Sequence, residues 1–330
     1  MARIVRFNKT GGAEVLQIVE ESVTAPASNE VQIQVHAIGL NRAETMYRNG
    51  MYLETPQFPS RLGYEAAGRV TAVGKDVTEF KVGDAVSTIP AFSMNQYGSY
   101  GELVNMPAHA VAKNPASLSW VEASAIWMQY TTAYGALVDI ANINAGDFVL
   151  ITAASSSVGI AAIEIANMLG ATPIAMTRKS NKKEALLKVG AKYVIASEEQ
   201  DIVAEVNKIT HDKGARVVFD PVGGPTLNKL ADATALGGII FQYGALSTEP
   251  TPLPLFAVLS KQLTIRGYVL FELSTNPLRL AKAKKFVIEG LNSGKLKPII
   301  AKTFPFEQIA EAHRYMESNE QLGKIVVTVN

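Results

Sequence analysis

A run of small residues between an apolar strand and an apolar helix is the stretch of this sequence best suited to chemistry. The segment FVLITA (148–153) is followed by Ala154-Ser155-Ser156-Ser157-Val158-Gly159 and then by a helical pattern. In a dinucleotide fingerprint the first small residue makes a tight turn, the second lets backbone approach a pyrophosphate, and the third lets helix and strand pack closely. Ala154, Ser156 and Gly159 stand at those places.

Two interpretations of this turn remain open. The first is a phosphate site, in which helix N–H groups and serine hydroxyls bind an anion. The second is a helix that a serine caps after a buried strand, with no ligand. In the first case we expect the phosphates to contact Ser155, Ser156, Ser157, Val158 and Gly159.

The end of the next predicted strand favours the phosphate site. About 20 residues past such a turn, a dinucleotide fold presents an acidic side chain to the ribose of NAD or a basic one to the 2′-phosphate of NADP. Here Thr177 is followed by Arg178 and Lys182, with no carboxylate before Glu184. Guanidinium and ammonium groups suit a phosphate. We therefore expect NADPH with Thr177, Arg178 and Lys182 as contacts, the alternative being a solvated basic helix start.

Composition excludes several other kinds of site. The chain has 330 residues, a formal charge of +1 and no cysteine, which excludes disulfides, thiolate zinc sites, iron–sulfur clusters and cysteine nucleophiles. Its four histidines, His36, His109, His211 and His313, are scattered. No apolar run reaches the roughly 18 residues that span a bilayer, and no secretory signal is visible. We expect a cytoplasmic protein with no affinity for nucleic acid or membrane.

Two domains are expected from the length and from a change of pattern. Residues 1–120 hold short, alternating, strand-like runs with frequent Gly and Pro, typical of an antiparallel β domain. Residues 121–265 alternate short apolar strands (148–153, 172–177, 193–196, 215–220 and 237–244) with helical stretches, typical of a parallel sheet. The tail 266–330 is expected to complete the first domain.

The order and spacing of several short motifs resemble the medium-chain dehydrogenase/reductases, in their zinc-independent quinone oxidoreductase-like branch. The motifs are Gly63-Tyr64-Glu65-Ala66-Ala67-Gly68, KVGDAV (81–86), GSYGELV (98–104), AASSSVG (153–159), FDPVGG (219–224) and GKIVV (323–327). The resemblance covers essentially the whole chain. It implies an α/β protein with a GroES-like β-rich catalytic domain and a Rossmann coenzyme domain with a doubly wound parallel sheet.

The resemblance also implies that this chain lacks the zinc of other family members. The places of the catalytic zinc ligands hold Asn41, Tyr64 and Met128, and the segment 90–97 is too short for a structural zinc lobe. The remaining chemistry is hydride transfer from a nicotinamide to an electrophilic carbon, as in quinones and α,β-unsaturated carbonyls. Such a reaction needs a hydrogen-bond donor at the developing oxyanion and a proton source.

The candidates for these roles come from the first domain. Tyr52 matches a tyrosine that relatives place in the substrate and nicotinamide pocket, and Tyr64 can act as a second hydroxyl donor. Asn41 is expected to bond a carbonyl or the nicotinamide ribose. Met46 stands where many relatives have a tyrosine, which leaves the preferred substrate open. For Arg48, Glu44 and Glu65 we favour a structural role, and His313 is interpreted as a surface or capping residue.

The resemblance supplies further coenzyme contacts and a partner. Thr132 falls where relatives bond the nicotinamide ribose, and Lys324 is expected either to reach the adenosine phosphates or to end a helix. Matched segments add Val222, Tyr243, Gly244, Tyr268 and Val269. Relatives form homodimers through edge strands, and here 237–247 would be that strand, with 250–259 clasping the partner.

The predicted function is NADPH-dependent, metal-free reduction of quinones or activated double bonds. A non-catalytic NADPH-binding or redox-sensing protein is the principal alternative, and turnover with any acceptor separates the two. A zinc alcohol dehydrogenase is a third possibility, which is disfavoured because the positions of the zinc ligands hold Asn41, Tyr64 and Met128.

Overall fold

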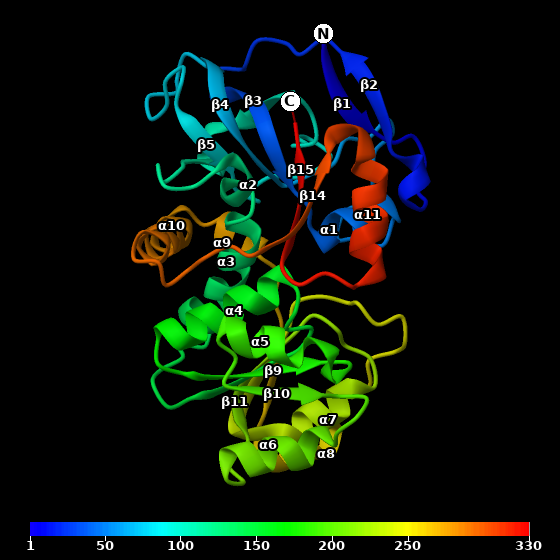
Figure 1. Cartoon of the computed structure of the whole chain (residues 1–330), viewed down its shortest axis with the longest axis vertical. Coiled ribbons are helices and arrows are strands. Elements are labelled where there is room, and N and C mark those ends of the chain that lie inside the picture. Colours follow the sequence, from blue (N-terminus) through cyan, green and yellow to red (C-terminus); the bar gives the residue numbers. More distant parts are fainter. Residues whose placement is uncertain (330) are drawn as a thin grey trace. The chain divides into compact units, whose positions relative to one another are not determined.

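The computed structural model describes residues 1–329, and the chain forms two compact units (Figure 1). Unit 1 consists of Met1–Met128 and Pro298–Asn330, and unit 2 consists of Gln129–Lys297. No helix within residues 1–329 combines the length and the apolarity needed to cross a bilayer.

Unit 1 is built on a mainly antiparallel sheet. Within residues 1–329 its order is β14-β15-β3-β4-β5-β7, with β6 paired to β3, and β1 and β2 form a separate hairpin. In β3 buried residues alternate with half-exposed or exposed ones along VQIQV, the pattern of a sheet with one buried face. The strands are β1 (Ala2–Arg6), β2 (Gln17–Glu21), β3 (Glu30–Gly39), β4 (Glu65–Val73), β5 (Ala85–Thr88), β6 (Leu103–Pro107), β7 (Val111–Lys113), β14 (Ile300–Pro305) and β15 (Lys324–Thr328).

Short helices close the ends of this sheet. They are α1 (Arg42–Arg48), α2 (Trp120–Ala123), α11 (Ile309–Ser318) and the 3₁₀ turns Ala13–Val15, Ala108–Ala110 and Phe306–Gln308. Helix α1 directly follows β3, and α11 packs against α1 and β15. The end of β3 and the start of α1 therefore lie beside the last strand of the chain.

Unit 2 is a parallel sheet between helices. Its strand order is β10-β9-β8-β11-β12-β13, so the chain runs outward from β8 in both directions. This is the strand order of dinucleotide-binding α/β folds, in which ligands bind at the carboxyl ends of the two central strands, where the order reverses. The strands are β8 (Phe148–Ile151), β9 (Thr172–Thr177), β10 (Tyr193–Ala196), β11 (Ala215–Asp220), β12 (Thr234–Gln242) and β13 (Thr264–Gly267).

The helices of unit 2 follow these strands in the usual alternation. They are α4 (Ser157–Met168), α5 (Lys183–Val189), α6 (Ile202–Thr210), α7 (Thr226–Ala233), α8 (Leu255–Lys261), α9 (Phe271–Ser274) and α10 (Pro277–Asn292), with a π-helical turn at Gly135–Ile140 and a 3₁₀ turn at Ser180–Lys182. Helix α3 (Trp127–Tyr134) contains the boundary between the units. The fold class predicted from the sequence is confirmed, with three of the five predicted strands at their predicted bounds.

The predicted assignment of the tail 266–330 was wrong for its first half. Residues up to Lys297 belong to unit 2, because β13 pairs with β12 and Arg279 of α10 is ion-paired to Asp139. The Phe286 ring also packs on the Tyr134 ring, with the ring centroids 5.0 Å apart. Only the part from Pro298 onward, with β14, α11 and β15, completes unit 1.

The predicted edge strand also needs correction. The apolar run 237–247 contains the second part of β12, which is paired on both sides, with β11 and β13. Within residues 129–297 the open edge on that side is β13, and both of its terminal residues are exposed.

Candidate functional site

The turn after β8 in unit 2 has the geometry of a phosphate loop although it lacks the usual glycines. Ala153 adopts φ of +45°, the left-handed region that an L-residue enters only at a cost in strain. The tight turn is therefore made at Ala153, one residue before the predicted Ala154. The next N–H, that of Ala154, donates to the Met176 carbonyl at 3.1 Å, which ties the turn to the end of β9.

Gly159 is the one position of the turn where only glycine fits. A Cβ on Gly159 would lie 2.7 Å from the backbone Cα and O of Ala154. The first turn of α4 can thus approach the strand end closely, as the third small residue of a dinucleotide fingerprint requires. Ser156 is the N-cap of α4, because its Oγ accepts the Gly159 N–H at 3.1 Å. The capped-helix interpretation is confirmed for Ser156, and its hydroxyl proton remains able to donate to a ligand.

One member of the basic cluster predicted after β9, Lys182, contacts this turn. Lys182 Nζ donates to Ser155 Oγ at 3.2 Å, and the Arg178 side chain is exposed. Ser155, Ser157 and Val158 are half-exposed at the start of α4. A positive charge beside a helix N-terminus is unfavourable for the helix dipole unless an anion lies between them. The arrangement therefore favours an anionic ligand.

A buried aspartate that the sequence analysis did not select organises the neighbouring turn. Asp220, at the end of β11, accepts a hydrogen bond from the Thr152 hydroxyl and from the N–H groups of Val222 (3.0 Å) and Gly223 (2.9 Å). Burial raises the pKa of the Asp220 carboxyl, although these hydrogen bonds act in the opposite direction. Its signal in the sequence was an acidic residue ending the apolar strand ARVVFD.

Two tyrosines of unit 2 were predicted to lie near the coenzyme. The buried hydroxyls of Tyr243 and Tyr268 have no hydrogen-bond partner within residues 1–329. The Tyr243 ring stacks on the Phe219 ring, with the ring centroids 3.9 Å apart. The Tyr268 hydroxyl faces Gly135, whose Cβ would meet it at 2.0 Å. Buried hydroxyls are normally satisfied, so the Tyr243 hydroxyl fits a site that a ligand or water completes.

The remaining predicted contacts of unit 2 differ in exposure. Thr132 is buried in α3, whereas Val222 and Gly244 are half-exposed and Val269 is 41% exposed. A Cβ on Gly244 would lie 2.8 Å from the Pro221 carbonyl, so the segment after β12 packs closely on the turn after β11.

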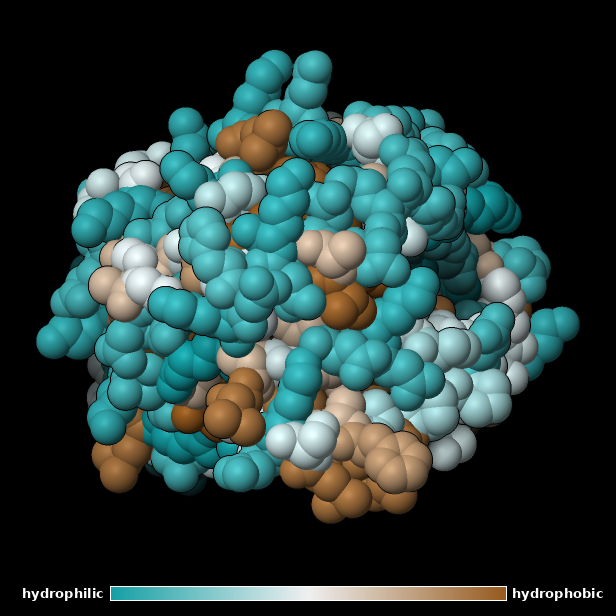
Figure 2. Space-filling model, turned by 90° about the horizontal axis from the view of Figure 1, so that it is seen from below, coloured by the Kyte–Doolittle hydropathy of each residue, from teal (hydrophilic) through white to brown (hydrophobic). Residues whose placement is uncertain are grey.

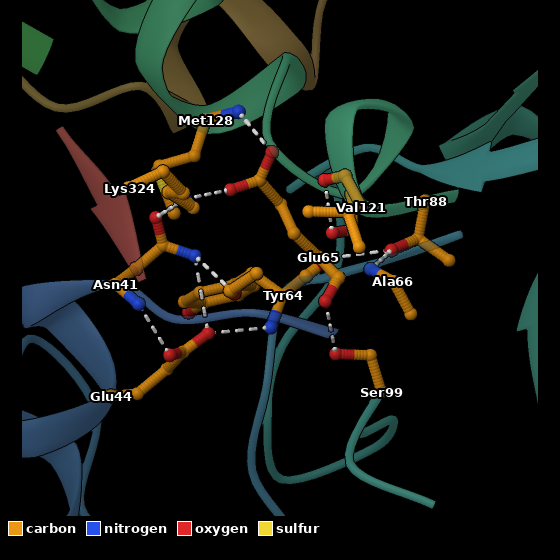
Figure 3. A network of polar contacts seen from close by, with 12 residues as sticks. Asn41, Glu44, Tyr64, Glu65, Ala66, Thr88, Ser99, Val121, Met128 and Lys324 are labelled. Atoms are coloured by element: carbon orange, nitrogen blue, oxygen red, sulfur yellow. Dashed lines mark hydrogen bonds and ion pairs between the residues drawn. The ribbon is translucent and has the colours of Figure 1, made fainter. Parts of the chain in front are cut away.

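In unit 1 the predicted Asn41 lies in a dense buried network (Figure 3). Its Oδ1 accepts from Lys324 Nζ at 2.5 Å, and its Nδ2 donates to the Gly39 carbonyl and to Glu44 Oε1. An amide nitrogen has two hydrogens, and both are used here. Asn41 therefore has no donor left for a substrate carbonyl, which corrects one of its two predicted roles. A second lone pair on Oδ1 is still able to accept from a ribose hydroxyl.

Lys324 is part of the same buried network as Asn41. Its ammonium group is buried and ion-paired with Glu65, whose other oxygen accepts the Met128 N–H at 2.9 Å. In Figure 3 the Lys324 side chain points toward Asn41 and Glu65. Lys324 therefore has buried polar partners of its own within unit 1, and its contact with the adenosine phosphates stays a prediction. Lys324 cross-links β15, β4 and the start of α1.

A second part of this network contains His313, which was wrongly interpreted as a surface or capping residue. His313 is fully buried, with its ring nitrogens bonded to Arg48 Nη1 (3.0 Å) and the Tyr100 hydroxyl (3.2 Å). Burial first, and then the charge of Arg48, lower the pKa of His313 to about 3, so the ring is neutral. Tyr100 donates to Glu44 Oε2 at 2.6 Å, which links this part to Asn41.

The predicted tyrosines Tyr52 and Tyr64 face each other in unit 1. Their ring centroids are 6.5 Å apart, Tyr64 is fully buried, and Tyr52 is half-exposed. Burial raises the pKa of Tyr52 to about 12 and that of Tyr64 well above its usual value, so both hydroxyls stay protonated. The neighbouring Tyr47 bonds Ser60 and Asn95 instead. Tyr52 is thus the more exposed residue of the pair.

The three positions that match the catalytic zinc ligands of other family members carry side chains of unit 1 that bind zinc poorly. The oxygen of Asn41 contacts Lys324, Tyr64 presents a protonated phenol, and the Met128 backbone bonds Glu65. Within residues 1–329 no group of three or more His, Asp or Glu side chains is placed to hold a metal ion.

Comparisons with known proteins agree over the whole chain. A family model described as alcohol dehydrogenase GroES-like domain matches residues 27–116, and one described as zinc-binding dehydrogenase matches residues 157–288. Quinone oxidoreductase 1 of Escherichia coli K12 is 33% identical over 98% of both chains. A 2-haloacrylate reductase of Burkholderia sp is 31% identical over 99% of this chain and 98% of that protein. The crystal structure of Escherichia coli quinone oxidoreductase complexed with NADPH matches with a TM-score of 0.90 and 32% identity, covering 99% of both chains.

Proposed function

Because the chain belongs to the medium-chain dehydrogenase/reductase superfamily, in its quinone oxidoreductase-like branch, we propose that it is an NADPH-dependent reductase of quinones or α,β-unsaturated carbonyls. A relative of 33% identity over 98% of both chains is named a quinone oxidoreductase, and a second is named a 2-haloacrylate reductase. Haloacrylates contain a double bond activated by a carboxyl group. Quinones and haloacrylates, the compounds in the two names, are both electrophilic and conjugated acceptors.

The turn after β8 is the observation that carries the coenzyme assignment. Gly159 lets the first turn of α4 pack closely on the strand end, as the third small residue of a dinucleotide fingerprint requires, and Lys182 Nζ lies 3.2 Å from Ser155 Oγ, where its charge suits a phosphate. Arg178, exposed beside it, is proposed to bind the 2′-phosphate that distinguishes NADPH from NADH. When bound, NADPH supplies the hydride that reduces the acceptor.

The proposed roles in unit 1 follow from which polar atoms are still available. Tyr52 is a half-exposed residue, and its hydroxyl is proposed to donate a hydrogen bond to the acceptor oxygen as negative charge develops there. Asn41 is limited to accepting a hydrogen bond through Oδ1. Glu44, Glu65 and Lys324 hold Asn41 and the backbone of Tyr64 in place.

We also propose that the reaction proceeds without zinc. The chain has no cysteine, and the Asn41, Tyr64 and Met128 side chains are poor zinc ligands. Elemental analysis of the purified, active protein tests this: activity without stoichiometric zinc supports the proposal, and loss of activity on chelation with recovery on zinc addition contradicts it.

A cytoplasmic homodimer completes the proposal. The edge strand β13 leaves backbone groups unpaired, and in the chain before it the segment preceding α8 and α8 itself carry exposed apolar side chains. These are Leu253 (62% exposed), Leu255 (51%), Phe256 (86%) and Leu259 (67%). Figure 2 views the molecule from the side of α6, α7 and α8, and apolar side chains gather at the lower margin. Light scattering should give a particle mass twice that of the chain, and Phe256→Asp should lower the measured mass toward that of the monomer.

NADPH oxidation with a panel of acceptors tests the activity. Turnover with a simple quinone or enone, and not with saturated ketones, supports the proposal. NADPH binding without turnover of any acceptor favours the alternative of a non-catalytic NADPH-binding or redox-sensing protein. Fractionation of cells tests the location.

A further inference from the structure

The loop that carries Tyr52 has no regular structure of its own. Residues 51–59 form neither helix nor strand, and Met51 and Leu53, on either side of Tyr52, are 65% and 67% exposed. A side chain on such a loop has a defined position only where other parts of the chain hold the loop. We infer that Asn95 is a positioning residue, which fixes this loop and thereby the Tyr52 hydroxyl that meets the acceptor. The inference rests on the proposed function, because that function places the acceptor oxygen at Tyr52.

The side chain of Asn95 uses all of its hydrogen-bonding capacity on this loop and on Tyr47. Its Oδ1 accepts from the Gln57 N–H at 2.9 Å and from the Tyr47 hydroxyl at 2.7 Å. Its Nδ2 donates to the Thr55 carbonyl at 3.0 Å and to Glu54 Oε2 at 3.3 Å. An amide side chain has two donor hydrogens and two acceptor lone pairs, so all four are occupied. Three of the four partners follow Tyr52 in the same loop.

Glu54 gives the loop a second attachment to the segment that carries Asn95. Its carboxylate accepts from the Ser93 hydroxyl and from the Met94 N–H at 3.0 Å, in addition to Asn95. Hydrogen bonds to an ionised carboxylate are stronger than those between neutral groups. Three consecutive residues of one segment therefore bond a single side chain of the loop.

The turn 92–97, which contains Asn95, is itself held by hydrogen bonds and burial. The Ser93 carbonyl accepts the Gln96 N–H at 3.1 Å, and Ser93 Oγ accepts the Asn95 N–H at 3.1 Å. A serine that bonds the backbone of its own turn limits the conformations available there. Met94, beside Asn95, is fully buried. The turn is therefore a rigid support for the Asn95 side chain.

Two aromatic rings face Tyr52, and the same turn contacts both of them. The ring centroid of Tyr52 lies 6.5 Å from that of Tyr47 and 6.5 Å from that of Tyr64. The Tyr47 hydroxyl bonds Asn95, and the Tyr64 ring packs on the Phe92 ring with the centroids 5.5 Å apart. The turn thus fixes the loop of Tyr52 and the rings against which Tyr52 lies.

This arrangement has a consequence for catalysis. A donor stabilises a developing oxyanion best when it is held in place before the reaction. Loss of the Asn95 side chain leaves the Tyr52 hydroxyl in the protein but releases the loop that carries it. Turnover of the acceptor should therefore fall, whereas NADPH binding should not change, because its proposed phosphate contacts lie in unit 2.

The first test needs neither coenzyme nor turnover. A fluorinated tyrosine is placed at position 52 only, and its fluorine NMR signal is recorded in the ligand-free protein. The rings of Tyr47 and Tyr64 should displace this signal from its value in the unfolded chain. Asn95→Ala should shift the signal toward the unfolded value, because the loop is released. An unchanged signal overturns the inference.

Asn105→Ala is the matched control. Asn105 is half-exposed on β6, its Nδ2 donates to the Thr24 carbonyl at 3.0 Å, and its Oδ1 accepts from Gln32 at 3.2 Å. This variant should leave the signal at position 52 unchanged, and an equal shift in both variants overturns the inference. If Asn95→Ala does not fold, Asn95→Asp takes its place, since it keeps the two acceptor roles of the side chain and loses the two donor roles.

An exchange of the two bonded side chains tests the pair of Asn95 and Glu54 directly. Asn95→Asp places a second carboxylate against Glu54, so it should lower kcat more than Asn95→Ala does. Glu54→Gln in that background returns an amide donor to the pair. It should move the fluorine signal back toward that of the wild type and raise kcat about threefold. Absence of recovery in both readouts would overturn the inference.

The last test is a double-mutant cycle on kcat with a quinone or enone acceptor. Asn95→Ala should lower kcat about tenfold in the wild-type background and have no further effect in Tyr52→Phe, with the Kd for NADPH unchanged in both. An equal loss in both backgrounds would show that Asn95 acts independently of Tyr52, and would overturn the inference. Absence of turnover in the wild type would instead refute the proposed function, and the fluorine spectra then decide alone whether Asn95 fixes Tyr52.

Discussion

Glu164 on α4 offers a quantitative test of the electrostatics of unit 2. Its carboxylate accepts from the Tyr130 hydroxyl at 2.8 Å and from the backbone N–H of Lys297. Burial raises the pKa of Glu164 from 4.5 to about 7, and these hydrogen bonds offset only part of that effect. The perturbation is Glu164→Gln, which keeps the size and an acceptor oxygen and removes the charge.

The sign of the effect follows from proton linkage. Below pH 4.5 the carboxyl is protonated in both the folded and the unfolded chain. Between pH 4.5 and about 7 the unfolded chain releases the proton first, so the folded state loses stability as the pH rises, and above pH 7 the loss is complete. A carboxyl pKa raised from 4.5 to about 7 corresponds to about 3 kcal/mol of lost stability. Most of this, about 2 kcal/mol or more, develops between pH 5 and pH 8.

Urea unfolding of wild type and Glu164→Gln at pH 5, 6, 7 and 8 measures the effect. The difference in free energy of unfolding, Glu164→Gln minus wild type, should increase by about 2 kcal/mol from pH 5 to pH 8. Glu184→Gln, at an exposed site of α5, controls for the general loss of one negative charge. A constant difference between wild type and Glu164→Gln across this range would refute the raised pKa and the burial argument behind it.

Three further predictions concern the coenzyme loop and the buried network. Gly159→Ala should abolish measurable NADPH binding and destabilise the protein by about 2 kcal/mol, because the added Cβ meets the Ala154 backbone at 2.7 Å; calorimetry and thermal unfolding check both, and tight binding by the variant would contradict the close approach. Arg178→Ala with Lys182→Ala should raise Kd for NADPH at least tenfold more than Kd for NADH, and an equal loss of both would contradict the 2′-phosphate assignment. Lys324→Met should cost about 3 kcal/mol or more by leaving the Glu65 charge buried and unpaired; if the role of Lys324 is structural, the Kd for NADPH stays unchanged, and a large loss of affinity would instead support its predicted contact with the coenzyme.

Local patterns were sufficient to predict the strands and the coenzyme turn. β9, β10 and β11 begin and end where their apolar runs do, because strands buried on both faces need uninterrupted apolar residues. The small residue at position 159 likewise predicted the close approach of helix and strand. The left-handed turn at Ala153 was missed because alanine carries no signal for that conformation.

Contacts between distant parts of the chain could not be predicted in this way. Lys324 and Asn41 are 283 residues apart, and Arg48 and His313 are 265 apart, so no local spacing indicates that they meet. His313 lies on a helix with several charged residues, which is the usual pattern of an exposed element. The strand β13 is short and half-exposed, so nothing in its residues showed that the chain stays in unit 2 beyond it.

The central claim is that the protein transfers hydride from NADPH to an electrophilic carbon. Anaerobic reaction of a simple enone with NADPH deuterated at C4 on the transferring face, followed by mass analysis of the product, tests it most directly. The account predicts one deuterium on the β-carbon of the saturated product, at a rate that Tyr52→Phe lowers by a hundredfold or more. NADPH oxidation without deuterium in any product, or deuterium at the carbonyl carbon of an alcohol product, would contradict it.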